Sequence, residues 1–158
     1  MDGQFHDVGI YLGGTITGLS YAEAVARRNE IAEPLVELGF PIHSPMRGKR
    51  RYLSAEKKIA SGGYAFPMSS DRAIFDRDHW DVVHRSTILI FDFLDATEKS
   101  LGSIMEIAWG AEYRKFIILI MEPGNIHDHA FVRAAATVIV KTREEAVKLV
   151  MEWAGIDV

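Results

Sequence analysis

The chain has 158 residues, a formal net charge of −4 and a hydrophobic fraction of 48%. This length suits one domain with a full core, so we expect a single domain over residues 1–158. The acidic balance argues against binding of a nucleic-acid polymer, which usually needs a basic surface. The lack of cysteine excludes disulfides and thiolate metal sites and fits a cytoplasmic protein. No signal peptide is visible and no apolar run approaches the ~18 residues of a membrane span, so no membrane association is expected.

The first elements are a buried strand, a small-residue loop and a helix. Residues 8–12 form the strand and residues 13–18 the loop. Ser20 then predicts a helix start, because Glu23 three residues later completes a capping box. The helix carries apolar residues at helical spacing as far as Leu38.

The helix ends before a second strand and a long irregular segment. Pro34 predicts that the helix is kinked or divided, and Gly39 marks its C-terminal end. Residues 40–43 form a second short strand. The segment 44–70 is rich in Gly, Ser and Pro and has one weak helical pattern, at 54–60. We interpret it as a long loop insertion, and loops of this length are usually functional or mobile.

The second half alternates strands with helices. We expect strands at 87–92, 116–121 and 137–140 and helices at 71–84, 102–113, 126–135 and 142–154. The last helix begins with another capping box, formed by Thr142 and Glu145. This alternation predicts an α/β fold: a doubly wound, flavodoxin-like five-stranded parallel sheet with helices on both faces.

The turn from Ser100 to Glu106 is the central feature of this pattern. It joins the third strand to a helix, and ligands of open parallel sheets bind at such turns, outside the carboxyl ends of the strands. The helix dipole stabilises the ionised form of a carboxylate near the helix start, which suits a nucleophile or general base. Glu106 is therefore a candidate catalytic residue. The alternative is a carboxylate that only stabilises the helix.

Three further residues are expected to converge on the same crevice. Tyr11 lies near the end of the first strand. Asp92 ends the third strand, where a carboxylate can accept hydrogen bonds from sugar hydroxyls. Asp78 interrupts an apolar helical stripe, and a buried carboxylate is costly unless it is paired or hydrogen-bonded. Asp78 is therefore either a structural hydrogen-bonding residue or a site residue.

The loop after the first strand is expected to contact the ligand. Its glycines allow backbone amides to approach an anion, and the helix that follows adds partial positive charge. The loop does not have the G-x-G-x-x-G pattern of dinucleotide-binding proteins, and a plain glycine-rich turn is the alternative. The residues concerned are Gly13, Gly14, Thr15, Ile16, Thr17 and Gly18.

Two clusters of polar residues allow both a functional and a structural interpretation. The basic cluster in the long segment could hold a phosphate, although a solvated loop is the commoner explanation. Its members are Arg47, Lys49, Arg50 and Arg51. The compact group His127, Asp128 and His129 follows the fourth strand and could contact a ligand. The histidines show no metal-ligand spacing, so neither a metal nor a cofactor is expected.

The motifs together resemble those of the nucleoside 2-deoxyribosyltransferases and the related deoxynucleoside 5′-monophosphate N-glycosidases. The resemblance covers nearly the whole chain, from about residue 8 to 150. Each matching piece is short, but their order and spacing are fairly specific. The pieces are Ile10-Tyr11-Leu12-Gly13-Gly14, Arg77-Asp78, Ile90-Phe91-Asp92, and Ser100-Leu101-Gly102 with Glu106.

The resemblance implies a role for each of three residues. Glu106 would attack the anomeric carbon of the sugar and form a covalent glycosyl-enzyme, as in retaining glycosidases. Asp78 would assist with protons at the base, and Tyr11 would orient Glu106. The substrate would be a 2′-deoxynucleoside or its 5′-monophosphate, together with a free nucleobase in a transfer reaction.

The resemblance also bears on the phosphate and on a partner subunit. Ser100 and Gly102 match a phosphate-binding turn. Thr17 stands where an arginine is usual, so Arg47, Arg50 or Arg51 could supply the missing charge. The family's sites are completed by a neighbouring subunit, which implies a homodimer or larger oligomer.

Asn125 or His129 falls near the position of the partner's contribution in the transferases, though neither matches cleanly. The long segment 44–70 departs from the compact family pattern. It leaves the preference for a particular base undetermined.

The leading hypothesis is N-glycosidic cleavage through Glu106 with transfer of the deoxyribosyl group to another base, ranked slightly above hydrolysis. Hydrolysis of a nucleoside 5′-monophosphate, including a ribonucleotide, is the alternative. A nucleotide-binding module without turnover and a flavodoxin-like redox flavoprotein are alternatives from other classes.

Overall fold

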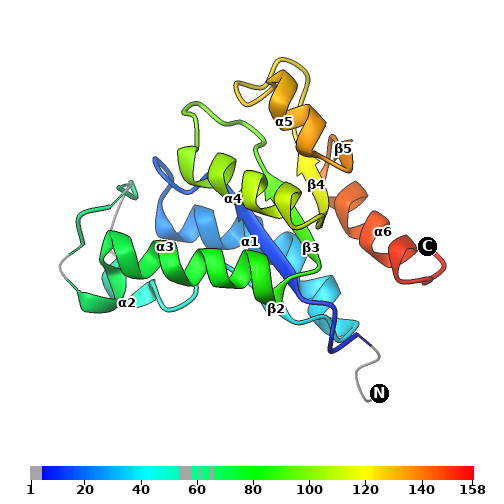
Figure 1. The fold of residues 1–158 in the computed structure, drawn as a ribbon, viewed down its shortest axis with the longest axis horizontal. Helices are drawn as coiled ribbons and strands as arrows, with labels where there is room; N and C mark the ends of the chain where they lie inside the picture. The colour runs from blue at the N-terminus through cyan, green and yellow to red at the C-terminus, as the bar shows by residue number, and fades with distance from the viewer. Residues whose placement is uncertain (1–4, 54–57, 61, 65) are drawn as a thin grey trace.

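The computed structural model describes residues 5–53, 58–60, 62–64 and 66–158, and of Arg51 and Tyr52 only the backbone. Its core is a five-stranded parallel sheet with the order β2-β1-β3-β4-β5 (Figure 1). The predicted doubly wound, flavodoxin-like sheet is confirmed. The strands are β1 (Ile10–Gly14), β2 (Ile42–His43), β3 (Ile88–Asp92), β4 (Phe116–Ile120) and β5 (Val138–Val140).

Helices follow the strands as the alternation predicted. They are α1 (Tyr21–Glu37), α2 (Arg50–Leu53), α3 (Asp71–Trp80), α4 (Leu101–Glu112), α5 (Ala130–Ala135) and α6 (Arg143–Trp153). A 3-10 turn at Pro67–Ser69 precedes α3, and α3 continues into a π-helical turn at Asp81–Arg85. Within the described residues, no helix combines the length and the apolar character that crossing a membrane requires.

The local signals set most helix ends. Both predicted capping boxes are present, at the starts of α1 and α6. Pro34 lies inside α1 without dividing it, since the helix is assigned as one element through Glu37. Gly39 has a φ of 92° and donates to the carbonyl of Val36 at 2.9 Å, which closes α1 as expected.

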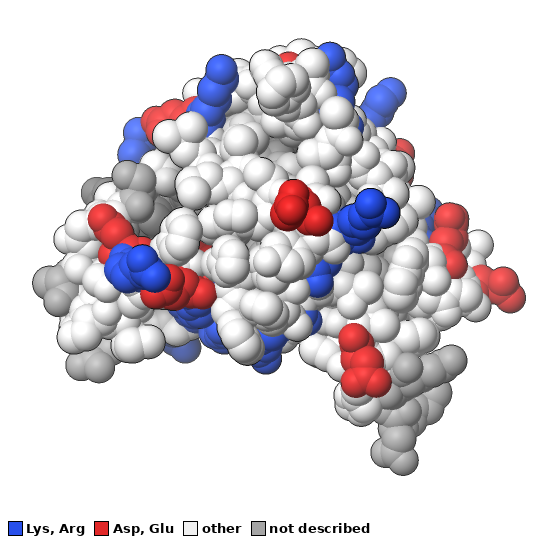
Figure 2. All heavy atoms as spheres, in the orientation of Figure 1, with Lys and Arg blue, Asp and Glu red and all other residues white. Residues whose placement is uncertain are grey.

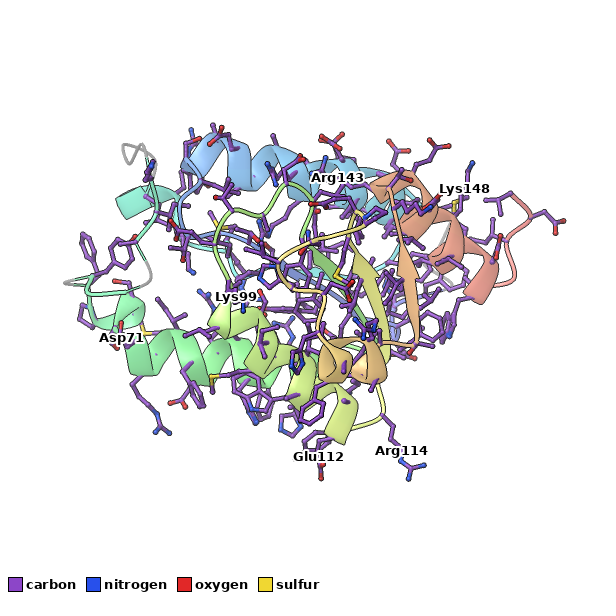
Figure 3. All side chains as sticks on the ribbon, turned by 90° about the horizontal axis from the view of Figure 1, so that it is seen from above. Asp71, Lys99, Glu112, Arg114, Arg143 and Lys148 are labelled. Atoms are coloured by element: carbon purple, nitrogen blue, oxygen red, sulfur yellow. The ribbon has the colours of Figure 1, made fainter. Side chains whose placement is uncertain are left out.

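The helices cover both faces of the sheet, with α1 and α6 on one face and α3, α4 and α5 on the other (Figure 3). Alternate residues of each strand serve the two sides, because side chains alternate along a strand. Ile10, Ile88 and Ile118 pack with α1 and α6. Tyr11, Leu89 and Ile117 pack in the core that faces α4. This parity decides which side chains reach the site described below.

The segment 44–70 forms a third, smaller core. Met46, Leu53 and Ile59 are buried together with Ala24 of α1. The helical pattern predicted at 54–60 is wrong in the part that can be seen, since the helical turn lies earlier, at Arg50–Leu53, and residues 58–60 are not helical. Residues 54–57 lie outside the described residues.

Candidate active site

The centre of the site is a hydrogen bond between β1 and α4. The hydroxyl of Tyr11 donates to Oε1 of Glu106 at 2.9 Å, and both side chains are buried. Tyr11 points toward α4 because it is paired with Leu89 of β3, and paired residues place their side chains on the same face of the sheet. Glu106 faces the sheet from the second turn of α4, with 7% of its surface exposed. The two residues expected to act together are therefore in contact.

Asp78 of α3 lines the same cavity as Glu106. It is buried, and its Oδ1 accepts two hydrogen bonds from the guanidinium of Arg77, at 3.0 and 2.8 Å. Arg77 also donates to the carbonyls of Pro45 and Arg47. Asp78 is thus both a hydrogen-bonding residue and a cavity residue, and the two interpretations left open by the sequence are compatible.

Burial perturbs both carboxyl groups. Desolvation raises the pKa of Glu106 to about 8, and the negative charge of Asp78 acts in the same direction. The hydrogen bond from Tyr11 and the positive charges of Arg28 and Lys49 oppose this rise. Desolvation also raises the pKa of Asp78, against the nearby charge of Arg77. Two close carboxyl groups with raised pKa values are typical of acid–base and nucleophilic sites.

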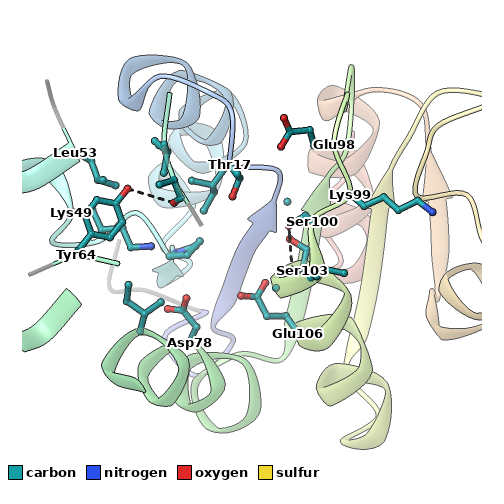
Figure 4. A pocket seen from close by; sticks show the side chains of 18 residues that line it. Thr17, Lys49, Leu53, Tyr64, Asp78, Glu98, Lys99, Ser100, Ser103 and Glu106 are labelled. Atoms are coloured by element: carbon teal, nitrogen blue, oxygen red, sulfur yellow. Dashed lines mark hydrogen bonds between the residues drawn. The ribbon is translucent and has the colours of Figure 1, made fainter. Parts of the chain in front are cut away.

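The cavity has a volume of about 380 Å³ and lies between the segment 44–64 and the start of α4. Figure 4 places Asp78 and Glu106 between these two ends. We call the first end the segment wall, which is made by Pro45, Lys49, Leu53, Ile59, Ala60 and Tyr64. The other end, the helix end, is made by Lys99, Ser100, Leu101, Gly102 and Ser103.

The helix end contains the turn that the sequence singled out. Ser100 is the N-cap of α4: its hydroxyl accepts from the amide of Ser103 at 3.4 Å and pairs with the Ser103 hydroxyl at 2.9 Å. The amide of Ser100 donates to Nε2 of the buried His127 at 2.8 Å. Ser100 and Gly102 both line the cavity at a helix N-terminus, where the first backbone amides have no partner within the helix.

The loop after β1 lies partly in the cavity. Gly14, Ile16 and Thr17 line it. Gly13 does not, but a Cβ there would lie 2.4 Å from the Phe91 ring and 3.2 Å from Oε2 of Glu106. Its lack of a side chain keeps space beside the carboxylate.

The other two loop residues are not among those that line the cavity. Thr15 is buried with an unpaired hydroxyl, and Gly18 has a φ of 86° and its Cβ position faces Glu98. Contact between these two residues and a substrate stays a prediction.

Asp78 and Glu106 line the cavity, and Tyr11 is joined to it through its hydrogen bond to Glu106, but Asp92 is not among the lining residues. The side chain of Asp92 lies on the same face of the sheet as those of Ile88 and Ile90, which face α1 and α6. Its Oδ2 accepts from Nε of Arg143 at 2.7 Å, and its Oδ1 accepts from the amide of Leu94. Figure 3 shows Arg143 on the side of α1 and α6. A role for Asp92 in substrate binding is not tested by this arrangement.

Arg47, one of the arginines expected to hold a phosphate, is not among the residues that line the cavity. Arg47 forms an ion pair with the buried Asp81, with Nη2 and Oδ2 at 2.9 Å. The side chain of Arg51 lies outside what the structure describes. Lys49 of the same basic cluster does line the cavity. Sequence could not separate it from its neighbours, because the segment gave no clear period.

The polar residues after β4 have structural partners. Asn125 is buried and donates to the carbonyl of Phe93 at 2.6 Å. His129 is the N-cap of α5, where its side chain accepts from the amide of Phe131. Neither residue lines the cavity of this chain, and their predicted contribution across a subunit interface is not tested.

Several cavity residues were not singled out from the sequence: Pro45, Leu53, Ile59, Ala60, Tyr64, Ile74, Glu98, Lys99 and Ser103. Most of them lie in the irregular segment or are apolar, and an apolar residue type gives no sign of a chemical role. In the described part of the chain, no three His, Asp or Glu side chains are grouped as a metal site would require.

The fold and the paired buried carboxyl groups define a flavodoxin-like α/β protein with an acidic cavity at the carboxyl end of its sheet. No protein-family model and no curated protein matches the chain in sequence. Among solved structures, the chain is similar to the CMP N-glycosidase BcmB of Clostridium botulinum, with a TM-score of 0.54 and 12% identity. The match covers 92% of this chain and 98% of that one, so the two share their fold over almost their whole length.

Proposed function

We propose that the protein cleaves the N-glycosidic bond of a nucleoside 5′-monophosphate, with Glu106 as nucleophile and water as the acceptor. The observation that carries this proposal is that Glu106, held by a buried hydrogen bond from Tyr11, lines one cavity together with Asp78. The resemblance of the sequence motifs to N-glycosidases and deoxyribosyltransferases supports it. So does the fold shared with a protein described as a CMP N-glycosidase.

The proposed reaction has two steps. Ionised Glu106 attacks C1′, and the electron pair of the C1′–N bond goes to the base, which takes a proton from the Asp78 carboxyl. Water then attacks C1′ and releases Glu106, and the proton of that water restores Asp78. Tyr11 holds one oxygen of Glu106, so the other is directed to the sugar.

A phosphate subsite at the helix end makes the monophosphate the favoured substrate. The start of α4 offers backbone amides and the positive end of a helix dipole to the cavity. The hydroxyls of Thr17, Ser100 and Ser103 can donate to phosphate oxygens. The ammonium of Lys99 points away from the cavity in Figure 4 and is not assigned to this subsite.

Transfer of the sugar to another base is the second candidate function. A covalent intermediate can be released by any nucleophile that reaches C1′, and the segment wall offers apolar side chains to an incoming base. Leu53 and Ile59 are buried in that wall. The resemblance also implies a homodimer with sites completed by the partner, and we include this in the proposal.

The test is a product assay with four mixtures. The protein is incubated with nucleosides or with their 5′-monophosphates, each with and without a free acceptor base, and the products are separated by chromatography. Free base without acceptor indicates hydrolysis, and new nucleoside only with acceptor indicates transfer. No product in any mixture, or full activity in the Glu106→Gln variant, would contradict the proposal.

A further inference from the structure

The cavity contains a lysine for which the proposed reaction gives no role. Lys49 comes from the irregular segment, and only 8% of its surface is exposed. Figure 4 shows its side chain entering the cavity from the segment wall, on the side opposite Ser100 and Ser103. Of the two described lysines that line the cavity, Lys99 points outward in the same view and Lys49 is directed into the cavity.

The backbone holds Lys49 in this position. Its amide donates to the carbonyl of Met46 at 3.1 Å, and its carbonyl accepts from the amide of Leu53 at 2.9 Å. Met46 and Leu53 are buried in the small core against α1. Two further backbone hydrogen bonds join Ile59 to the loop after β1, at 3.0 and 2.8 Å. Lys49 is therefore part of a packed wall.

The surroundings of Lys49 contain charges of both signs. Asp78 and Glu106 attract its ammonium, and Arg77 and Arg28 repel it. Desolvation is the largest influence and lowers its pKa. Among the described residues, Lys49 has neither a hydrogen bond nor an ion pair to its Nζ. A buried ammonium without a partner is costly, so a ligand that accepts a hydrogen bond there gains affinity.

The position of Lys49 matches the place of the leaving base. With the sugar over Glu106 and the phosphate at the helix end, the base lies toward the segment wall. Asp78, the proposed proton donor, has the largest charge interaction with Lys49. Leu53 and Ile74 supply apolar contacts there. The base end therefore combines apolar walls with one cationic donor.

We propose that Lys49 is a specificity-determining catalytic residue whose ammonium hydrogen-bonds the carbonyl oxygen beside the glycosidic nitrogen of a pyrimidine base. This inference rests on the proposed function and specifies its substrate class. When the C1′–N1 bond breaks, the electron pair moves to N1 and is shared with O2. Lys49 stabilises that oxygen without losing its proton, and the base takes its proton from Asp78 as above. Such charge stabilisation acts mainly in the transition state.

The experiment compares leaving groups of different acidity. The substrates are uridine 5′-monophosphate and its 5-fluoro analogue, in ribo and 2′-deoxyribo forms, and the matching nucleosides. Lys49→Met keeps the length of the side chain and removes the charge, and Lys49→Arg keeps the charge. Lys58→Met is the matched control, because Lys58 is an exposed lysine of the same segment.

Lys49→Met should lower kcat/KM about 10- to 100-fold for the uracil substrate, the usual loss of one hydrogen bond to a charged group. The loss should be at least about threefold smaller for 5-fluorouracil, which leaves more easily as an anion. Lys49→Arg should retain more activity than Lys49→Met, and Lys58→Met should match the wild type. If Lys49→Met does not fold, the same comparison of the two bases is made with Lys49→Gln.

Three results would overturn the inference. The first is an equal loss for uracil and 5-fluorouracil. The second is a loss with monophosphates but none with nucleosides, which would assign Lys49 to the phosphate. The third is a wild type that turns over purine but not pyrimidine substrates. A wild type that releases no base from any substrate contradicts the proposed function itself, so the two failures are distinguishable.

Discussion

At the residue scale, the ionisation of Glu106 should set the pH dependence of activity. A nucleophilic carboxylate must be ionised, and burial beside Asp78 raises the pKa of Glu106 to about 8 in the free protein. Because kcat/KM reports the free enzyme, it should rise with pH as Glu106 ionises and pass through a maximum, since it falls where Asp78, the proposed proton donor, loses its proton. Initial rates at low substrate between pH 5.5 and 9 measure this limb. A flat profile over that range would exclude Glu106 as the titrating nucleophile.

The hydrogen bond from Tyr11 lowers the pKa of Glu106, so Tyr11→Phe should move the acidic limb of kcat/KM to higher pH. The variant should also lose about 10- to 100-fold in kcat/KM at pH 7, since one hydrogen bond to a charged group is removed. Tyr113→Phe is the control, because Tyr113 is an exposed tyrosine at the end of α4. An unchanged limb in Tyr11→Phe would show that the contact does not tune Glu106.

The same carboxyl group should make the protein less stable as the pH rises. Below about pH 4.5 Glu106 is neutral in the folded and unfolded chain, and between pH 4.5 and about 8 only the unfolded chain ionises it. Stability is therefore lost across this window, by at most about 5 kcal/mol, since one pKa unit corresponds to ~1.4 kcal/mol.

Glu106→Gln removes this cost but keeps an oxygen that can accept from Tyr11. It should have nearly the melting temperature of the wild type at pH 4.5 and a higher one at pH 9, while losing about a thousandfold or more in activity. Thermal unfolding followed by circular dichroism at several pH values measures the difference. Glu112→Gln, an exposed change on the same helix, controls for surface charge. If the difference in melting temperature between Glu106→Gln and the wild type does not grow with pH, the ionisation of Glu106 is not what makes stability depend on pH.

At the element scale, Arg77 couples the segment wall to the catalytic carboxyl groups. It donates to the carbonyls of Pro45 and Arg47 and to the carboxylate of Asp78. Arg77→Met should destabilise the protein by about 1–3 kcal/mol, because buried acceptors lose their donor. It should also raise the pKa of Asp78, since Arg77 lowers it.

Denaturant unfolding measures the loss of stability in Arg77→Met, and the pH dependence of kcat/KM measures the change in the pKa of Asp78. Arg72→Met is the matched control, because Arg72 lies on the same helix in an exposed pair with Asp76. Equal stability of the Arg77 and Arg72 variants would show that the segment does not depend on this link.

The elements show which features a sequence can predict. Capping boxes and apolar periods are local, and they located the helices and strands. Tyr11 lies in the first strand, Glu106 lies in the helix that follows the third strand, and Asp78 interrupts a helical stripe, and these positions singled out all three residues in the sequence. The segment wall was not predictable, since its packing depends on contacts with α1, which is distant in the sequence. Within one basic cluster, only the folded chain separates Lys49, which enters the cavity, from Arg47, which pairs with Asp81.

Asp92 illustrates a different limit. The strand pattern alone says that Asp92 shares a face with Ile88 and Ile90, but it does not say which face of the sheet that is. The register between β1 and β3 decides it, because Tyr11 lies opposite Leu89. Asp92 is thereby directed to Arg143 and away from Glu106. The register is a tertiary property, so position at a strand end was not sufficient.

At the scale of the whole molecule, a weakly charged aromatic face covers α3 and α4 and suits a second copy of the chain. Figure 2 shows this face with few charged side chains over its centre. Phe75, Trp80 and Met105 are exposed there, and Phe75 and His79 pack edge to face against Trp109. Monomeric proteins rarely expose large apolar patches without a function.

This aromatic face is continuous with the mouth of the cavity. Leu101, which lines the cavity, is 75% exposed at the start of α4, one turn before Met105. A second chain seated on α3 and α4 would therefore reach the helix end of the cavity. This geometry supports the proposal that a partner subunit completes the site, since two-fold dimers pair the same surface on both subunits.

The proposal predicts that the wild type sediments at twice the mass of the chain, and that Trp80→Glu converts it to a monomer. A buried unpaired charge is costly at an interface, so the dissociation constant should rise about 100-fold or more. Activity per chain should decrease as the fraction of dimer decreases, because the site in a monomer lacks the partner subunit. Trp153→Glu makes the same change on α6, outside the aromatic face, and should leave the mass and the activity unchanged. Sedimentation velocity over a range of concentrations separates these outcomes, and a monomeric wild type with full activity would refute a shared site.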